Sequence, residues 1–261
     1  MYDLFYYIYI MDQFQIKGLF ENKNLSLQIY NIIKNKKIIE IGGPSNNNNF
    51  IKKMYELCSK ITVINFEEIN NMSITSGAST DNNISKIEMI NTNNYDEFIE
   101  KNKGTYDILL TSHVIEHQAN PIKMIKLWKR LLNNNGIIIS ILPNKDFCFD
   151  YSRPVTKLSK LIDKYNKNVS EDDVSEIPLM LKYYKSNPSK LLEFKTHPNM
   201  TVDEFLNYIL FFYNNPEELE LKRPIHHYVY DLNLLKELSH YLEMEQIIEF
   251  TNYIDHWVFW K

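Results

Sequence analysis

The feature that most constrains this chain is a regular alternation, across residues 36–144, of short apolar segments with longer segments of helical periodicity. Short apolar runs bounded by polar residues favour buried strands, and apolar residues three and four positions apart favour helices. Strands that alternate with helices in this way pair in parallel, and the helices cover both faces of one sheet. The predicted elements are strands at 38–41, 61–66, 87–90, 106–110 and 137–142, and helices at 25–35, 50–59, 95–102 and 121–132.

The alternation changes in the second half of the chain. Residues 133–136, three asparagines and a glycine, are expected to end the preceding helix in a turn. Further on we expect helices at 202–213 and 232–242, and late strands at 225–230 and 257–260. The prediction is an α/β protein with a Rossmann-like, doubly wound, mostly parallel sheet, helices on both faces, and a helical insertion, or cap, before the last two strands.

This pattern divides the chain into four parts. We expect an N-terminal helical segment, a cofactor-binding core, a helical insertion that caps the substrate site, and C-terminal strands that complete the sheet. Their predicted bounds are 1–35, 36–150, 151–222 and 223–261, in that order.

The composition excludes several classes of protein. The 261 residues are 44% hydrophobic, enough for one large domain, and their net charge of −4 gives no overall basic footprint for nucleic acid. Cys58 and Cys148 are the only cysteines, too few for a disulfide framework or a zinc cluster, so we expect a reducing, cytoplasmic environment. No apolar run reaches the roughly 18 residues of a membrane span, and no membrane partner is expected.

A glycine turn follows the first predicted strand. Glu40 stands near the end of that strand, Gly42 and Gly43 follow, and Pro44 and Ser45 come next. Glycines at this point let a ligand approach the backbone closely. A dinucleotide needs a longer glycine loop for its pyrophosphate, so the shorter turn favours a cofactor without phosphate that carries an amino-acid end. The alternative is a plain turn of an α/β protein.

An acidic pair, Glu67 and Glu68, stands at the end of the second predicted strand. A carboxylate in this place can accept hydrogen bonds from both hydroxyls of a ribose, and Glu67 is the first candidate. The alternative is a solvated acid at a strand end.

Four polar residues, Ser112, His113, Glu116 and His117, follow the strand predicted at 106–110. Glu116 and His117 lie three and four positions after His113, so on a helix all three share one face. Three interpretations are open: a histidine acts as general base at the mouth of a substrate site, the three bind a divalent metal, or Glu116 and His117 cap and orient the loop. We adopt the first, name His113, Glu116 and His117 as candidate catalytic residues, and assign no metal ligand.

Three more side chains are candidates for binding a substrate. Arg153, after the fifth predicted strand, can pair with a phosphate or carboxylate, and the alternative is a surface salt bridge. His226 and His227 are consecutive, so on the strand predicted at 225–230 at most one of them faces the site. The alternative for either histidine is a structural role.

Together these segments resemble the successive motifs of class I S-adenosylmethionine-dependent methyltransferases. The resemblance covers residues 36–144 and rests on the glycine turn at 39–43, Glu67, and the segments 106–117 and 131–140. The segment Ser-His-Val-Ile-Glu-His is most similar to a group that carries Ser-His-Val-Leu-Glu-His. Residues beyond the core resemble those of bacterial and viral members found near glycan-synthesis genes.

The resemblance implies a sheet of seven strands, the seventh antiparallel, and S-adenosylmethionine as the cofactor. It places Gly42 and Gly43 beside the amino-acid end of the cofactor, Glu67 at its ribose and Asn91 beside its adenine. Pro44 stands where the family usually has a second glycine. The residues implied to bind the cofactor are Glu40, Gly42, Gly43, Pro44, Glu67, Asn91, Ser112 and His113.

The function that follows is transfer of a methyl group to an oxygen or nitrogen of a small acceptor, expected to be a sugar, sugar nucleotide or glycan. One alternative is a methyltransferase-fold binding protein without activity. Another is a metal-dependent RNA 2′-O-methyltransferase, because His113, Glu116, His117 and a distal histidine resemble the Glu-x-x-Glu-His and distal histidine of that group. The negative net charge ranks RNA below a carbohydrate.

Overall fold

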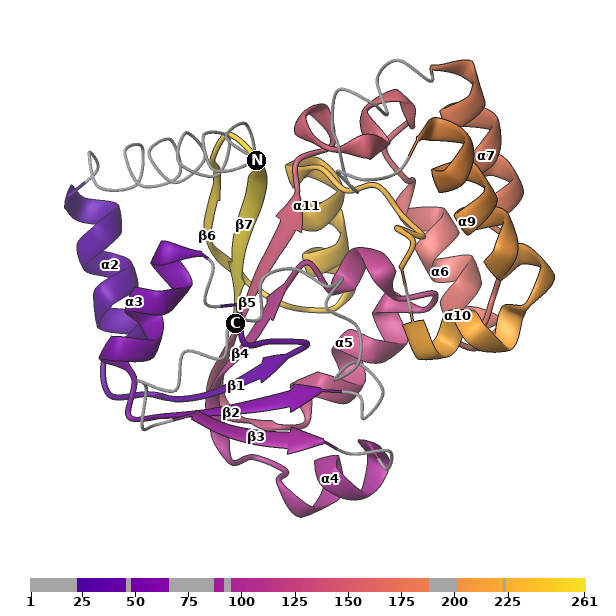
Figure 1. Cartoon of the computed structure of the whole chain (residues 1–261). Helices are drawn as coiled ribbons and strands as arrows, with labels where there is room; N and C mark the ends of the chain where they lie inside the picture. Colours follow the sequence, from indigo (N-terminus) through magenta and orange to yellow (C-terminus); the bar gives the residue numbers. More distant parts are fainter. Residues whose placement is uncertain (1–22, 46–47, 66–86, 92–94, 188–200, 223) are drawn as a thin grey trace.

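Figure 1 shows the chain as a computed structural model, in which residues 23–45, 48–65, 87–91, 95–187, 201–222 and 224–261 are described. Glu67 and Glu68, the candidate ribose ligands, lie outside these ranges. So does most of the N-terminal segment predicted at 1–35.

Seven strands form one twisted sheet (Figure 1). They are β1 (Lys37–Ile41), β2 (Lys60–Asn65), β3 (Ile87–Asn91), β4 (Tyr106–Ser112), β5 (Leu132–Pro143), β6 (Gln246–Thr251) and β7 (Asp255–Trp260). Their order across the sheet is β3-β2-β1-β4-β5-β7-β6. The first five strands pair in parallel, and β7 runs antiparallel to both β5 and β6.

Helices cover both faces of this sheet. The described helices are α2 (Lys23–Ile33), α3 (Asn49–Leu57), α4 (Tyr95–Lys101), α5 (Pro121–Lys129), α6 (Leu158–Asn166), α7 (Ile177–Ser186), α9 (Val202–Asn214), α10 (Pro216–Lys222) and α11 (Leu232–Tyr241). Of these, α2 and α3 pack on one face of the sheet and α4, α5, α6 and α11 on the other, whereas α7, α9 and α10 pack with one another. The α/β class and the Rossmann-like sheet predicted from the sequence are confirmed. None of the helices in the described part of the chain is both long and apolar enough to cross a bilayer.

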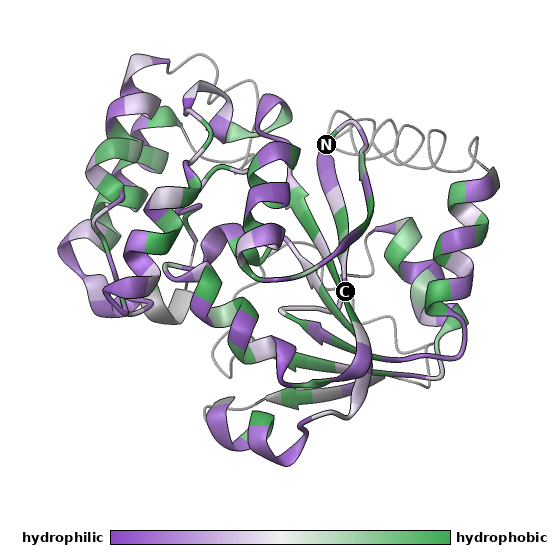
Figure 2. Ribbon diagram, turned by 180° about the vertical axis from the view of Figure 1, so that it is seen from behind, coloured by the Kyte–Doolittle hydropathy of each residue, from purple (hydrophilic) through white to green (hydrophobic). Residues whose placement is uncertain are grey.

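Adjacent residues of β1 pack into two different cores. Ile38 packs with Ile33 of α2 and Tyr55 of α3 on one face of the sheet. Ile39 packs with Ile125 of α5 on the other face, where α4 and α11 also lie. A strand buried on both faces needs apolar side chains at nearly every position, which is why the central strands read as continuous isoleucine-rich runs. Figure 2 shows this apolar character along the middle of the sheet.

A third core lies among the helices that follow β5. The buried side chains of α7, α9 and α10 pack together, among them Met180, Tyr184, Ile209 and Phe212. The described residues of this core come from helices and their connections, and none from a strand. By contrast, Leu161 of α6 packs with the sheet core. The helical segment therefore has its own apolar interior beside the sheet domain.

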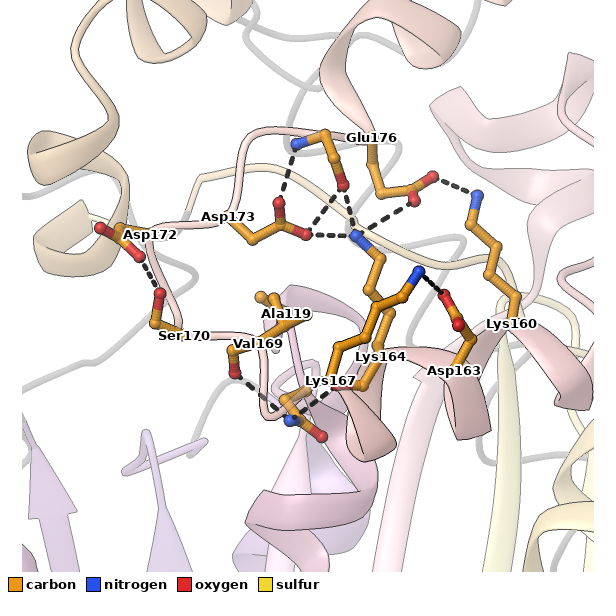
Figure 3. A network of polar contacts seen from close by, with 12 residues as sticks. Ala119, Lys160, Asp163, Lys164, Lys167, Val169, Ser170, Asp172, Asp173 and Glu176 are labelled. Carbon is orange, nitrogen blue, oxygen red and sulfur yellow. Dashed lines mark hydrogen bonds and ion pairs between the residues drawn. The ribbon is translucent and has the colours of Figure 1, made fainter.

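The connection between α6 and α7 is held by an ionic network (Figure 3). The Lys164 ammonium donates to Asp173 and to Ser175, and it lies 3.7 Å from Glu176 Oε1. Lys160, one turn earlier on α6, donates to the other oxygen of Glu176. Two lysines of one helix thus fix the acidic segment that leads into α7.

The structure corrects the strand predicted at 225–230. These residues are buried, but their backbone bonds to loops rather than to the sheet. His227 N donates to Glu116 O at 2.8 Å, and Val229 N donates to Thr156 Oγ1 at 3.0 Å. An apolar run indicates burial, but it does not specify which backbone partner satisfies the chain.

Two further differences concern β5 and β6. β5 begins at Leu132, so residues 133–136 belong to a strand instead of forming only the predicted turn. Tyr106 of β4 pairs with Leu132 of β5, and Ile108 pairs with Ile137. Two steps along β4 therefore match five steps along β5, so the asparagine segment forms a bulge. β6 was not predicted from the sequence, and its side chains at the sheet edge are mostly half-buried or exposed.

Candidate active site

The carboxyl ends of β1 and β4 lie side by side at the point where the strand order reverses (Figure 1). Gly42 follows β1 and donates its N–H to Ile64 O at 2.9 Å. His113 follows β4 and donates its N–H to Ile141 O at 2.9 Å. In open α/β sheets, ligands bind outside the carboxyl ends of the strands at such a switch point. The two segments singled out in the sequence therefore meet where a ligand is expected.

Glu40 is fully buried beneath the glycine turn. Tyr55 of α3 donates its hydroxyl hydrogen to Glu40 Oε2 at 2.5 Å. The backbone N–H of Ser45 is shared between Glu40 Oε1, at 3.1 Å, and Tyr55 Oη, at 2.8 Å. Burial raises the pKa of Glu40 above its ordinary value, although these bonds favour the carboxylate. The buried Glu40 carboxylate thus holds the backbone of Ser45, at the C-terminal end of the turn.

Both glycines of the turn occupy positions that a side chain could not share. A Cβ on Gly42 would lie 2.9 Å from Val114 Cγ2, and the φ of Gly42 is +78°. A Cβ on Gly43 would lie 2.2 Å from Glu40 Cδ. Gly42 is exposed, so its bare backbone is open to a ligand. The turn fits a cofactor that is held closely against the main chain.

His113 links the end of β4 to β7 with an unusual backbone conformation. Its φ of +53° is uncommon for a residue other than glycine. Its Nε2 lies 3.0 Å from Asp255 Oδ1, and its Nδ1 lies 3.4 Å from Glu116 Oε1. Burial opposes protonation, but these two carboxylates outweigh it and raise the pKa of His113 to about 10. The side chain is 39% exposed, so water screens part of this interaction.

Glu116 lies at the centre of three imidazoles. It belongs to a 3₁₀ turn, η2 (Ile115–His117), rather than to the helix that the spacing suggested. Glu116 Oε1 lies 3.4 Å from His113 Nδ1, 4.0 Å from His117 Nε2 and 4.0 Å from His226 Nε2. Burial favours the neutral acid, but the imidazoles, His113 first, lower the pKa of Glu116. Three neighbouring residues predicted from the sequence and one distant histidine therefore share one cluster.

His117 directs Nε2 toward this cluster, and no described residue forms a hydrogen bond with that nitrogen. Its Nδ1 lies 3.0 Å from Ile225 O, and because a carbonyl only accepts, Nδ1 carries the hydrogen. Burial and the neighbouring His226 lower the pKa of His117 to about 4. The ring is therefore neutral at pH 7, with the lone pair of Nε2 directed at the cluster.

Asp150 connects the cluster to the helical segment. Its Oδ2 lies 2.6 Å from His226 Nδ1, and its Oδ1 accepts from Arg153 Nη1 at 2.6 Å and Tyr184 Oη at 2.9 Å. Burial opposes ionisation, yet Arg153 and His226 hold the pKa of Asp150 well below its usual range. Arg153 also donates to the carbonyls of His226, at 2.8 Å, and His227, at 2.9 Å. Its guanidinium thus positions both histidines, and its contact with a substrate stays a prediction.

For the other predicted site residues, the structure gives a position in the fold but no contact that defines a role. Asn91 is the last residue of β3, Ser112 is the last of β4, and Pro44 lies in the turn after Gly43. His227 is buried, and neither of its ring nitrogens has a hydrogen-bond partner among the described residues.

Three residues of the site, Tyr55, Asp150 and Asp255, were not predicted from the sequence. The i, i+3 spacing of Asp150 and Arg153 was the one local signal that could have found an ion pair. Asp255 lies 142 positions from His113, and no local pattern connects them.

Comparison with known proteins agrees with this architecture. A family model described as a methyltransferase domain matches residues 12–207. The chain belongs to this methyltransferase-domain family. It is an S-adenosylmethionine-dependent methyltransferase by fold and family, and the predicted cofactor, S-adenosylmethionine, is confirmed.

Solved structures that match this chain include other methyltransferases. A SAM-dependent methyltransferase from Aquifex aeolicus is 11% identical, covers 97% of this chain and 95% of its own, and has a TM-score of 0.44. An O-methyltransferase family 2 protein from Planctomyces limnophilus, in complex with apigenin, is 8% identical over 87% of this chain and 50% of its own, with a TM-score of 0.46. The trans-methyltransferase CalH, in complex with SAH, is 11% identical over 89% and 54%, with a TM-score of 0.43. No curated protein matches the sequence. Similarity at this level does not specify a substrate.

Proposed function

We propose that this domain transfers a methyl group to an oxygen or nitrogen atom of a small acceptor, and that the acceptor is a sugar, sugar nucleotide or glycan. The observation that carries the proposal is the cluster of His113, His117 and His226 around the buried Glu116, beside the glycine turn. This cluster supplies polar, proton-accepting groups at the carboxyl end of β4, where an acceptor would meet the cofactor. The helices that follow β5 are the proposed cap over the acceptor.

The chemistry requires alignment first and proton removal second. S-adenosylmethionine supplies an electrophilic methyl group, and transfer is an in-line displacement that depends on the position of the acceptor. A hydroxyl acceptor also has to lose its proton. His117 donates through Nδ1 to Ile225 O, so its Nε2 is free to orient or receive that proton. Both ring nitrogens of His113 face carboxylates, those of Asp255 and Glu116, so this side chain is suited to orienting Glu116.

The acceptor class is supported by the polarity of the cluster and by the resemblance to members near glycan-synthesis genes. Carboxylate and imidazole groups favour a ligand rich in hydroxyls over an apolar one. The net charge of −4 argues against RNA, whose phosphates need a basic surface. A cytoplasmic location is inferred from the cysteine content, because Cys58 and Cys148 are too few for the disulfide framework of an oxidising compartment.

The first experiment measures cofactor binding by calorimetry, with S-adenosylmethionine and S-adenosylhomocysteine. Gly42→Ala is expected to weaken binding at least about tenfold, because its Cβ would meet Val114. Gly104→Ala is the matched control: its φ of +69° carries the same backbone penalty, but no atom lies within 4 Å of the added Cβ. If the intact protein binds neither compound, the enzyme proposal fails and a binding protein without activity is favoured.

The second experiment identifies the acceptor. Methyl transfer is measured with sugar nucleotides, glycans, small amines and RNA, using the wild type, His117→Asn and the exposed control His240→Asn. We expect transfer to a carbohydrate, a fall of about a hundredfold or more in kcat for His117→Asn, and unchanged cofactor affinity. Transfer to RNA alone would contradict the proposed acceptor.

A further inference from the structure

Three potential metal ligands converge on one point between η2 and the segment before α11. They are the carboxylate of Glu116 and the imidazoles of His117 and His226, each of which offers one ligand atom within 4.8 Å of the other two. Glu116 Oε1 lies 4.0 Å from Nε2 of each histidine. The two imidazole rings meet edge to face, with their centroids 4.7 Å apart. His117 and His226 are far apart in the sequence, so the tertiary fold brings them together rather than one motif.

Each histidine is oriented by a hydrogen bond on the side away from this point. His226 Nδ1 lies 2.6 Å from Asp150 Oδ2, and Asp150 is itself held by Arg153 and Tyr184. His117 Nδ1 lies 3.0 Å from Ile225 O. An imidazole that donates its Nδ1 hydrogen to a carboxylate or carbonyl presents Nε2 as a bare lone pair, which is the arrangement found behind metal-bound histidines.

The Glu116 carboxylate lies between the two rings without a hydrogen bond from the described part of the chain. Glu116 is fully buried, and among the described residues neither of its oxygens has a hydrogen-bond partner. A buried carboxylate in this condition is costly, so it indicates a group that completes its surroundings. The ion pair with His113 Nδ1, at 3.4 Å, involves Oε1 of Glu116.

We propose that Glu116, His117 and His226 bind one divalent first-row transition metal ion. Two imidazoles and a carboxylate suit zinc, iron, cobalt or manganese better than calcium or magnesium. Ligand atoms around a tetrahedral ion are about 3.4 Å apart. The 4.0 Å separations from Glu116 Oε1 therefore need only a small closure of the side chains.

Three protein ligands leave a coordination position open, as in catalytic rather than structural metal sites. If the proposed function holds, this position can take the acceptor hydroxyl and favour its ionisation, so that the ion, and not His117 Nε2, would activate the acceptor and the proton would pass to water. Only this last role rests on the proposed function, because the ligand set stands on its own geometry.

A second group, Cys148, Asp150 and His226, is also close enough to bind an ion. It is less suitable, because both oxygens of Asp150 already have hydrogen-bond partners in Arg153, Tyr184 and His226, whereas neither oxygen of Glu116 has one among the described residues. The test has to separate the two groups.

Metal binding is measured on chelator-treated full-length protein, with Zn²⁺ and Co²⁺ as probes and without cofactor. The wild type is expected to bind one ion per chain. Glu116→Gln and His226→Asn are expected to weaken binding by about a hundredfold or more, and the exposed control His240→Asn to leave it unchanged. Circular dichroism checks that each variant is folded.

X-ray absorption of the Zn²⁺-loaded wild type keeps the proposal testable if a variant fails to fold. We expect two imidazoles and only oxygen or nitrogen ligands. A sulfur ligand would assign the ion to Cys148, and absence of binding, or binding unaffected by Glu116→Gln, would overturn the proposal. Cofactor binding in the presence of chelator is measured separately, so that failure of the metal site and failure of the methyltransferase proposal give different results.

Discussion

Tyr55 donates a 2.5 Å hydrogen bond to Glu40, and this bond ties α3 to the end of β1 directly beneath the glycine turn. Both side chains are fully buried, so water cannot replace the bond if it is lost. The position of the turn, and with it the cofactor site, depends on a contact between a strand and the helix that follows it.

Tyr55→Phe tests this contact. The variant leaves a buried carboxylate with one fewer donor, and we expect it to lower the free energy of unfolding by about 1–3 kcal/mol in urea denaturation. Tyr165→Phe is the control, because the Tyr165 hydroxyl accepts from Lys126 at an exposed site. Equal destabilisation by the two variants would contradict the role given to Tyr55.

Arg153→Leu tests the ion pair with Asp150. Removing the guanidinium leaves Asp150 buried with its main positive partner gone, and we expect a loss of about 3–5 kcal/mol in the free energy of unfolding. The control is Arg130→Leu, which removes a partly exposed pair with Glu100 and is expected to cost about 1 kcal/mol or less. The expectation fails if Arg153→Leu costs no more than this control.

Lys164→Met tests the network of Figure 3 through its pH dependence. Burial opposes ionisation of Asp173, but the hydrogen bond from Lys164 lowers the pKa of Asp173 below its ordinary value. A group whose pKa is depressed in the folded state stabilises the protein above its unfolded pKa, about 3.9, and this contribution is lost as the pH falls through the folded pKa. Lys164→Met should therefore lose less stability than the wild type on acidification below about pH 4.

The measurement for Lys164→Met is the thermal midpoint across a series of pH values. Lys167→Met is the control, since Lys167 forms an exposed pair with Asp163 at 2.8 Å. Parallel pH profiles for the wild type and Lys164→Met would show that Asp173 does not carry this dependence.

Phe212→Ala tests whether the helical segment has its own core. Phe212 is fully buried among α7, α9 and α10, so a cavity there is expected to cost about 3–5 kcal/mol. Hydrogen exchange should accelerate in these helices while the amides of β1 and β4 stay protected. Its neighbour Phe211 is exposed, and Phe211→Ala should change exchange little. Uniform acceleration that includes the sheet would show that the helical segment and the sheet unfold together.

The order of elements in the first half of the chain could be predicted because its causes are local. Buried strands such as β1 and β4 read as short apolar runs, and α5 begins with Pro121, which suits the first turn of a helix. Where pairing depends on distant backbone, prediction was weaker. Residues 225–230 are buried but form no strand, and β6 was not predicted from the sequence.

The site divides in the same way. Glycines after a strand, and the close spacing of His113, Glu116 and His117, are properties of neighbouring residues, so they are visible in the sequence. The approach of His226 to Glu116, and of Asp255 to His113 across 142 positions, has no local signal. These contacts form because packing of the sheet and helices brings distant segments together, and burial then gives each polar group a partner that sequence spacing cannot specify.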